Sequence, residues 1–303
     1  MIRQLQDLVR LIFYGNIFYG LCAVAMCIET NVVMGLGLNH FPFYLLIFFG
    51  SWIYYTMIYV RSTSANANKE INAWYRQNLN RIKNVLSAVL LVEVLLACYF
   101  VSFHFNAIKQ LSLLHWLLLA SVPAGGALYT FHMPAPFKKF RQIGWLKPIV
   151  IGATWTGWVT IFPVVAWQVQ YGIPGEHIYP QPLFWLINLI FITALAIIFD
   201  VKDYKTDIQK DLMTYPAQYG IKNTYRYILL PLTVFSIILV VLFQINNGFT
   251  FAQSIIQQLP FLLLLYIINK RPGSLNTLYY LFYIDGLMLL KALCNIVSIE
   301  FFK

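Results

Sequence analysis

The sequence has few charged residues. Asp, Glu, Lys and Arg together make up 11% of its 303 positions, whereas a soluble chain usually carries about 25%. Hydrophobic residues account for 60% and aromatic residues for 17%. A large soluble helical protein would need more polar surface than this composition supplies. We therefore expect most of the chain to lie within a lipid bilayer.

Cysteine, linker sequence and internal repeats are also scarce or absent. The four cysteines lie in apolar stretches and lack the spacing of a metal-ligand pair, which argues against a cysteine-based metal site or a disulfide framework. No Pro-, Gly- or Ser-rich linker divides the chain, so we expect residues 1–303 to form one integral-membrane domain. A transporter built on internal repeats is the least favoured class, because no repeat is visible.

Long apolar runs are what the sequence has in abundance. A helix needs about 20 apolar residues to cross the hydrocarbon core of a membrane. About nine such runs predict an all-α fold, a polytopic membrane helical bundle of about nine transmembrane helices. The runs cover approximately residues 10–28, 41–60, 85–105, 111–131, 149–169, 183–199, 227–245, 251–268 and 276–299.

The formal net charge of +10 could suggest a nucleic-acid partner, but the distribution of the charges indicates membrane topology instead. Basic residues gather in alternate connections between the apolar runs, as the positive-inside rule describes. They lie at Arg3 and Arg10, in 61–84, 132–148 and 200–226, and at Lys270 and Arg271. We therefore expect a multi-pass membrane protein with a cytoplasmic N-terminus, a C-terminus on the opposite side, contact with membrane lipids and no nucleic acid.

The most informative stretch follows the sixth apolar run. Asp200, Asp203, Asp207 and Asp211 are four of the eleven acidic residues in the chain. On an α-helix, their spacing places all four within an arc of about 80°. Like charges on one face repel each other unless a cation lies against them. Because Mg²⁺ binds through one or two carboxylates together with substrate phosphates, the stripe predicts a metal site for a phosphorylated, lipid-soluble substrate.

Two segments resemble the UbiA superfamily of intramembrane prenyltransferases. Asp200-x-x-Asp203-x-x-x-Asp207, followed by Thr214-x-Pro216 and Gly220, is similar to the second Asp-rich motif of the family and its trailing segment. Leu128-Tyr129-Thr130, followed by Lys138-Lys139, resembles the family's tyrosine and basic loop between the fourth and fifth helices. The predicted topology also resembles that of the family over nearly the whole chain.

The sequence departs from the family at the end of the second apolar run. Members normally carry a first Asp-rich motif there, whereas residues 54–64 contain no carboxylate. In the family, the two motifs hold Mg²⁺ ions that bind the diphosphate of a prenyl donor. The nearest acidic residue, Glu70, could replace a missing ligand or could be an ordinary surface carboxylate.

The resemblance implies Mg²⁺-dependent transfer of a prenyl group from a polyprenyl diphosphate to an aromatic or other lipid-soluble acceptor. It assigns Asp203 and Asp207 to catalysis and, with Asp200, to the metal. Diphosphate binding falls to Tyr129 and to the basic residues Lys138, Lys139 and Arg141. Cation–π attraction could stabilise an allylic cation, with Tyr55, Tyr59, Trp155 and Trp158 as candidates. The alternative is a catalytically degenerate member that binds a prenyl lipid or quinone, or acts as a scaffold.

Each candidate also has a structural explanation. The aspartates could form a solvated face beside lysines, although Lys202 and Lys205 lie on the opposite side of a regular helix. The basic residues could reflect topology or contact with anionic lipid, and Tyr129 could be an interfacial anchor. Polar residues also occur within the apolar runs and should face the bundle interior: Glu93, His115, Asp285 and Lys291. For Lys291, pairing with Asp285 or Glu93 is one possibility.

Overall fold

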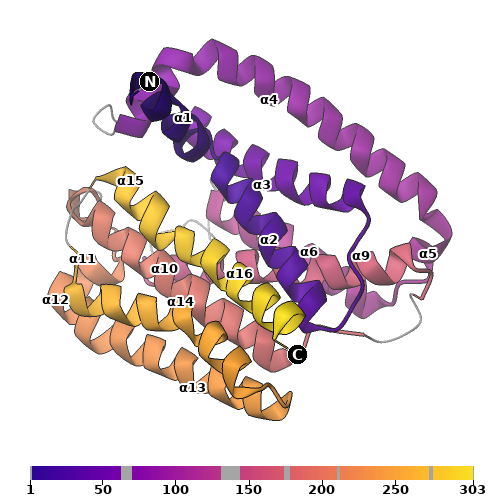
Figure 1. Ribbon diagram of the computed structural model, residues 1–303. Coiled ribbons are helices and arrows are strands. Elements are labelled where there is room, and N and C mark those ends of the chain that lie inside the picture. The colour runs from indigo at the N-terminus through magenta and orange to yellow at the C-terminus, as the bar shows by residue number, and fades with distance from the viewer. Residues whose placement is uncertain are drawn as a thin grey trace.

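The computed structural model describes residues 2–62, 70–130, 144–173, 178–209, 212–272 and 276–302, and the regular structure within these ranges is helical. The helices run roughly alongside one another, and the N- and C-termini lie at opposite ends of the bundle (Figure 1). In chain order, the first half contains α1 (Ile2–Tyr14), α2 (Ile17–Val33), α3 (Phe41–Ser62), α4 (Glu70–Phe103), α5 (Phe105–Lys109) and α6 (Leu113–Thr130).

The second half contains several helices interrupted by π-helical turns, labelled η. These elements are α8 (Leu146–Thr156), η1 (Gly157–Ile161), α9 (Phe162–Gln170), α10 (Pro182–Gln209), α11 (Tyr215–Tyr219), α12 (Ile221–Asn223), η2 (Thr224–Leu229), α13 (Leu230–Asn246), α14 (Phe251–Lys270), α15 (Thr277–Tyr279), η3 (Tyr280–Ile284) and α16 (Gly286–Phe301). The expected all-α membrane bundle is thus confirmed.

The number of membrane spans agrees approximately with the expected nine. Among the described residues, seven helices are long and apolar enough to cross a bilayer, and α1 with α2 forms an eighth candidate bent by 60°. Residues Leu113–Ala127 of α6 form a further, shorter apolar helix. The bend falls at Asn16, whose φ of 59° lies in the left-handed region that Asn tolerates better than most residues. Its side chain donates hydrogen bonds to Tyr75 Oη and Thr56 Oγ1 at 2.7 and 3.3 Å.

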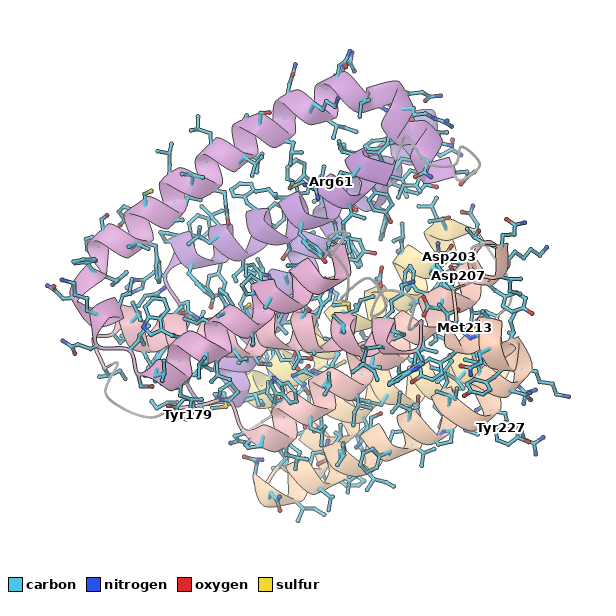
Figure 2. The ribbon with its side chains drawn as sticks, turned by 180° about the vertical axis from the view of Figure 1, so that it is seen from behind. Arg61, Tyr179, Asp203, Asp207, Met213 and Tyr227 are labelled. Atoms are coloured by element: carbon cyan, nitrogen blue, oxygen red, sulfur yellow. The ribbon has the colours of Figure 1, made fainter. Side chains whose placement is uncertain are left out.

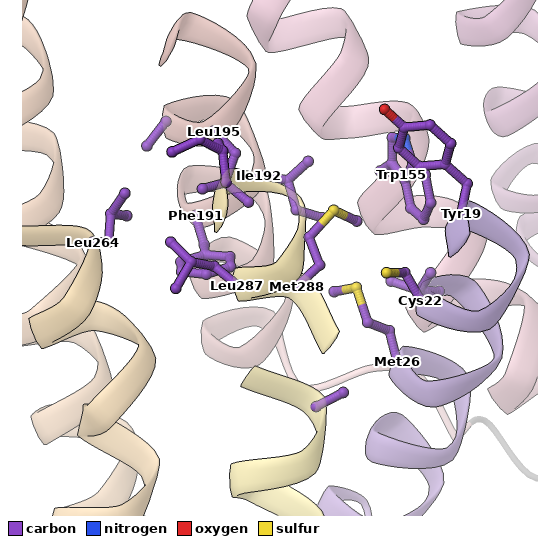
Figure 3. Close-up of a cluster of buried hydrophobic side chains, with 14 of the residues drawn as sticks. Tyr19, Cys22, Met26, Trp155, Phe191, Ile192, Leu195, Leu264, Leu287 and Met288 are labelled. Atoms are coloured by element: carbon purple, nitrogen blue, oxygen red, sulfur yellow. The ribbon is translucent and has the colours of Figure 1, made fainter. Parts of the chain in front are cut away.

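The helices pack in a ring. Successive contacts run from α2 to α16, α14, α13, α10 and α8, and η1 returns to α2, while α3 lies against α2 and α4 covers α3. Buried side chains from α2, α8, α10, α14 and α16 meet inside this ring (Figure 3). Close approach of α8 to α10 depends on Gly152, because a Cβ there would collide with the hydroxyl of Thr193.

Candidate functional site

A cavity of about 560 Å³ lies inside the bundle. Residues of α2, α3, α6, α8, η1, α10 and α16 contribute to its lining. One end carries ionisable side chains and the rest is mainly apolar and aromatic. The ionisable residues at that end are Arg61, Lys147, Asp200, Lys202 and Asp203. A sixth, Asp285, lies beside the aromatic residues, where its Oδ2 accepts a hydrogen bond from Tyr19 Oη at 2.7 Å. This arrangement suits a ligand with a charged head and an apolar body.

The aspartates lie on the last turns of α10, as their helical spacing predicted. Asp200 and Asp203 line the cavity, and the side chain of Asp200 is 2% exposed whereas that of Asp203 is 26% exposed. Asp207 is buried, and its Oδ2 accepts a hydrogen bond from Thr214 Oγ1 at 3.2 Å. Asp203 and Asp207 lie close together at one end of the bundle, with Arg61 of α3 at the same end (Figure 2). Asp211 lies outside the described residues.

Two lysines pair with Asp200 and Asp203, the carboxylates of α10 that line the cavity. Lys147 Nζ lies 2.6 Å from Asp200 Oδ1, and Lys202 Nζ lies 3.0 Å from Asp203 Oδ1. The position of Lys202 on a regular helix suggested that it does not neutralise the acidic stripe directly. This was wrong, because its Nζ reaches the carboxylate of the adjacent Asp203. In the sequence, Lys147 falls in the basic connection 132–148. Its position at the start of α8, which packs closely on α10, reveals its role as the partner of Asp200.

The cavity residues fit one metal ion held jointly with a ligand. No cluster of three or more His, Cys, Asp or Glu side chains suited to a metal occurs in the part of the chain that the structure describes. Asp200 Oδ2, however, is buried and has no hydrogen-bond partner among the described residues. Asp203 is partly exposed beside it. Because Mg²⁺ commonly binds through one or two carboxylates and completes its shell with water and phosphate oxygens, these two side chains suffice for such a site.

Some of the predicted site residues contribute to the cavity and others lie outside the described residues. The side chain of Tyr129 and the residues Lys138, Lys139 and Arg141 lie outside the described part of the chain. Arg61, in contrast, is described and lines the cavity from α3, near the position where the first Asp-rich motif would lie. Glu70 does not line the cavity, and its Oε2 accepts a hydrogen bond from Tyr14 at 2.9 Å.

Aromatic side chains form one wall of the cavity. Tyr55, Tyr59, Trp155 and Trp158, the candidates from the sequence, all contribute to its lining. The rings of Tyr19 and Tyr55 stack with centroids 4.0 Å apart, and Trp155 Nε1 donates a hydrogen bond to Tyr55 Oη at 2.6 Å. These contacts fix the orientation of the rings, so their faces form a rigid surface beside the ionisable end.

Lys291 has a different partner from the ones the sequence suggested. Its Nζ lies 2.5 Å from Glu29 Oε1, and each of these side chains is 1% exposed. Asn295 Nδ2 also donates a hydrogen bond to Glu29. Glu29 was expected in the loop after the first apolar run, whereas the structure places it inside α2. Sequence alone offered no signal for the pairing, because the two residues are 262 positions apart.

Solved structures with the same helical arrangement confirm the UbiA-like fold. A UbiA homologue from Archaeoglobus fulgidus bound to GPP and Mg²⁺ matches with a TM-score of 0.60 at 13% identity, over 96% of this chain and 99% of the other. The same homologue bound to DMAPP and Mg²⁺ matches with a TM-score of 0.56, again at 13% identity over 96% and 99% of the two chains.

A structure of digeranylgeranylglyceryl phosphate synthase matches with a TM-score of 0.57 at 16% identity, over 96% of this chain and 97% of the other. No family model and no curated protein matches the sequence. At these identities, the likeness establishes the fold of a multi-pass membrane protein.

Proposed function

We propose that the chain is a divergent member of the UbiA superfamily that transfers a prenyl group from a prenyl diphosphate to a lipid-soluble acceptor. The observation that carries this proposal is the cavity, in which carboxylates and cations at one end adjoin an apolar, aromatic interior. A prenyl diphosphate has the same division between a charged head and an apolar tail. Two of the structures with this fold hold GPP or DMAPP together with Mg²⁺, which supports the assignment.

The charged end would hold the diphosphate. Bound Mg²⁺ supplies positive charge that stabilises the leaving diphosphate. Asp200 and Asp203 would hold the ion, and the family resemblance adds Asp207, although its Oδ2 accepts a hydrogen bond from Thr214 in this structure. Lys147, Lys202 and Arg61 line the same end and would add positive charge where the end of α3 lacks carboxylates. Lys138, Lys139, Arg141 and Tyr129 remain predicted contributors.

The aromatic wall would orient the prenyl chain and stabilise the positive charge that develops as the allylic C–O bond breaks. Tyr55 and Trp155 are fixed by their mutual hydrogen bond, and Trp158 Nε1 donates to Ser51 Oγ at 2.9 Å. Their faces therefore need little rearrangement to meet a cation. The apolar surroundings also exclude water, which would otherwise capture the cation.

The orientation in the membrane follows from charge. We propose that the end of the bundle with Asp203 faces the cytoplasm, where the positive-inside rule places the basic connections. Soluble prenyl diphosphates would then reach the charged end of the cavity directly. Labelling of a cysteine introduced at Glu300 by an impermeant reagent should occur from the outside of intact cells. Labelling that requires permeabilised cells would contradict this orientation.

Transfer assays on purified protein test the proposed function. Protein in nanodiscs is incubated with radiolabelled GPP, a panel of lipid-soluble alcohols and phenols, and either Mg²⁺ or EDTA. We expect Mg²⁺-dependent formation of a prenylated product, and its loss in Asp203→Asn. Glu300→Gln removes an exposed carboxylate near the C-terminus. It is the matched control and should retain transfer. Equal transfer by Asp203→Asn would contradict the role of the acidic stripe.

A second candidate is a catalytically degenerate protein that binds prenyl lipids. The ion pairs of Lys147 with Asp200 and of Lys202 with Asp203 favour it, because they compensate the carboxylates without a metal. This candidate predicts that a prenyl lipid without a diphosphate, such as geraniol, binds as tightly as GPP, and that EDTA changes neither affinity. Mg²⁺-dependent preference for GPP would exclude it.

A further inference from the structure

The cavity contains a carboxylate that the diphosphate site does not use. Asp285 lines the cavity from the start of α16, on a different helix from the acidic stripe, and is 6% exposed. Its Oδ2 accepts a hydrogen bond from Tyr19 Oη at 2.7 Å. Among the described residues, no hydrogen bond or ion pair reaches Oδ1. A carboxylate buried in an apolar environment is costly unless its oxygens are used, so Oδ1 is suited to accept a hydrogen bond from a ligand.

The local backbone directs this carboxylate toward the cavity. The π-helical turn η3 ends immediately before Asp285, and the Asp285 backbone N–H donates to Tyr280 O at 3.1 Å, five residues earlier. A π turn contains one residue more than an α turn and rotates the side chains that follow. Such turns occur frequently at functional sites. The placement of Asp285 is therefore built into the helix.

The surroundings of Asp285 restrict what could bind there. Tyr19, which holds Oδ2, also stacks on Tyr55, and Trp155 lies against the same pair. Figure 3 shows Tyr19 and Trp155 side by side, with Cys22 and Met288 nearby. This surface accommodates an apolar or aromatic body with one polar group. A cationic ligand is disfavoured, since Arg61, Lys147 and Lys202 already line the cavity.

We propose that Asp285 marks the acceptor subsite and that the acceptor is a lipid-soluble alcohol or phenol whose O–H donates to Oδ1. This inference rests on the proposed prenyl transfer. In the reaction, the C1–O bond of the prenyl diphosphate breaks, and its electron pair leaves with the diphosphate. A lone pair of the acceptor oxygen forms the new bond to C1. The hydroxyl proton passes to Asp285, so that prenyl ether, diphosphate and protonated Asp285 are the products.

The test uses two probes, 1-naphthol for the subsite at Asp285 and GPP for the diphosphate end of the cavity. Binding of tritiated 1-naphthol to protein in nanodiscs is measured by scintillation proximity, with unlabelled 1-naphthol or 1-methoxynaphthalene as competitor. The methoxy compound has the same aromatic body but no O–H to donate. Because hydrogen bonds to charged groups are strong, we expect 1-naphthol to compete about tenfold better in the wild-type protein. Mg²⁺-dependent GPP binding is measured in parallel and reports on the diphosphate end and on folding.

Two variants identify Asp285 as the source of this discrimination. Asp285→Leu should reduce the competition ratio to about one, because the acceptor of the hydrogen bond is gone. Tyr19→Phe removes the hydrogen bond to Oδ2 but keeps the carboxylate, so it should still discriminate between the two competitors. In each variant, saturable Mg²⁺-dependent GPP binding would show that the protein is folded and that the diphosphate end is intact.

Three outcomes would overturn the inference: no saturable 1-naphthol binding, equal competition by both compounds in the wild-type protein, or undiminished discrimination in Asp285→Leu. Should Asp285→Leu fail to fold, Tyr19→Phe provides the second test. Loss of the discrimination between the two competitors in Tyr19→Phe, which keeps the carboxylate, would also overturn the inference. Discrimination in the wild-type protein together with absent GPP binding would instead contradict the proposed prenyl transfer and leave an alcohol-binding site. GPP binding therefore tests the proposed prenyl transfer, and discrimination between the two naphthalene compounds tests the acceptor subsite.

Discussion

Two ion pairs, one open to the cavity and one fully buried between helices, differ in what surrounds them. Lys147 and Asp200 meet at the cavity, where the lysine side chain is 28% exposed and Asp200 Oδ2 has no hydrogen-bond partner among the described residues. Lys291 and Glu29 meet between α16 and α2, and each side chain is 1% exposed. The first pair lies on the cavity wall, where a ligand bound as we propose would contact it. The second is enclosed and serves to hold two helices together.

The largest expected effect comes from breaking the enclosed pair. Lys291→Met should lower the free energy of unfolding by about 3–5 kcal/mol, because Glu29 would remain as an uncompensated buried charge. Thermal unfolding of the purified protein in detergent measures this loss. The double variant Lys291→Met/Glu29→Gln removes both charges and should recover much of the stability. A single variant as stable as the wild type would show that the pair does not hold the helices.

Breaking the pair of Lys147 and Asp200 should affect ligand binding more than stability. Asp200→Asn should weaken Mg²⁺-dependent GPP binding by at least about tenfold, since it removes a charged ligand. Its loss of unfolding free energy should be smaller than that of Lys291→Met, because Lys147 can turn toward water in the cavity. Isothermal titration and thermal unfolding on the same preparation provide both values. A large loss of stability in Asp200→Asn without a loss of GPP binding would show that both ion pairs are structural.

The smallest expected effect concerns the hydrogen bond between Thr214 and Asp207. Thr214→Val should reduce the free energy of unfolding by about 0.5–1.5 kcal/mol, the usual value of one buried hydrogen bond. If Asp207 is positioned by this contact to help hold the metal, the Mg²⁺ concentration needed for half-maximal GPP binding should rise. Thr214→Ser keeps the hydroxyl and should retain wild-type values. An unchanged Mg²⁺ requirement in Thr214→Val would limit Thr214 to a structural role.

The fold was predictable from the sequence because lipid imposes strict requirements on composition and length. The apolar runs correspond to the helices, and the spacing of Asp200 and Asp203 correctly predicted a shared helical face. The break at Asn16 was not predicted, because it depends on hydrogen bonds to Tyr75 and Thr56 on other helices. Sequence reasoning also ended the first apolar run before Glu29, since a lone acidic residue in lipid is costly.

The candidate site was predictable only in part. The acidic stripe and the aromatic candidates could be identified, because their residue types indicate their chemistry. The pairing of Lys147 with Asp200, the location of Arg61 on the cavity wall and the exposure of Asp285 to the cavity depend on how distant helices pack. None of these contacts follows from local spacing. The same limitation explains why Lys291 was linked to Asp285 or Glu93 rather than to Glu29.

One measurement tests whether the cavity is a prenyl diphosphate site. GPP binding is measured with and without Mg²⁺, in the wild-type protein and in Asp203→Asn. We expect saturable binding to the wild-type protein that requires Mg²⁺ and that falls by at least about tenfold in the variant. Glu300→Gln, measured alongside, should bind as the wild type does. Binding that is indifferent to both Mg²⁺ and Asp203, or absent from well-folded protein, would contradict the claim that the cavity is a prenyl diphosphate site.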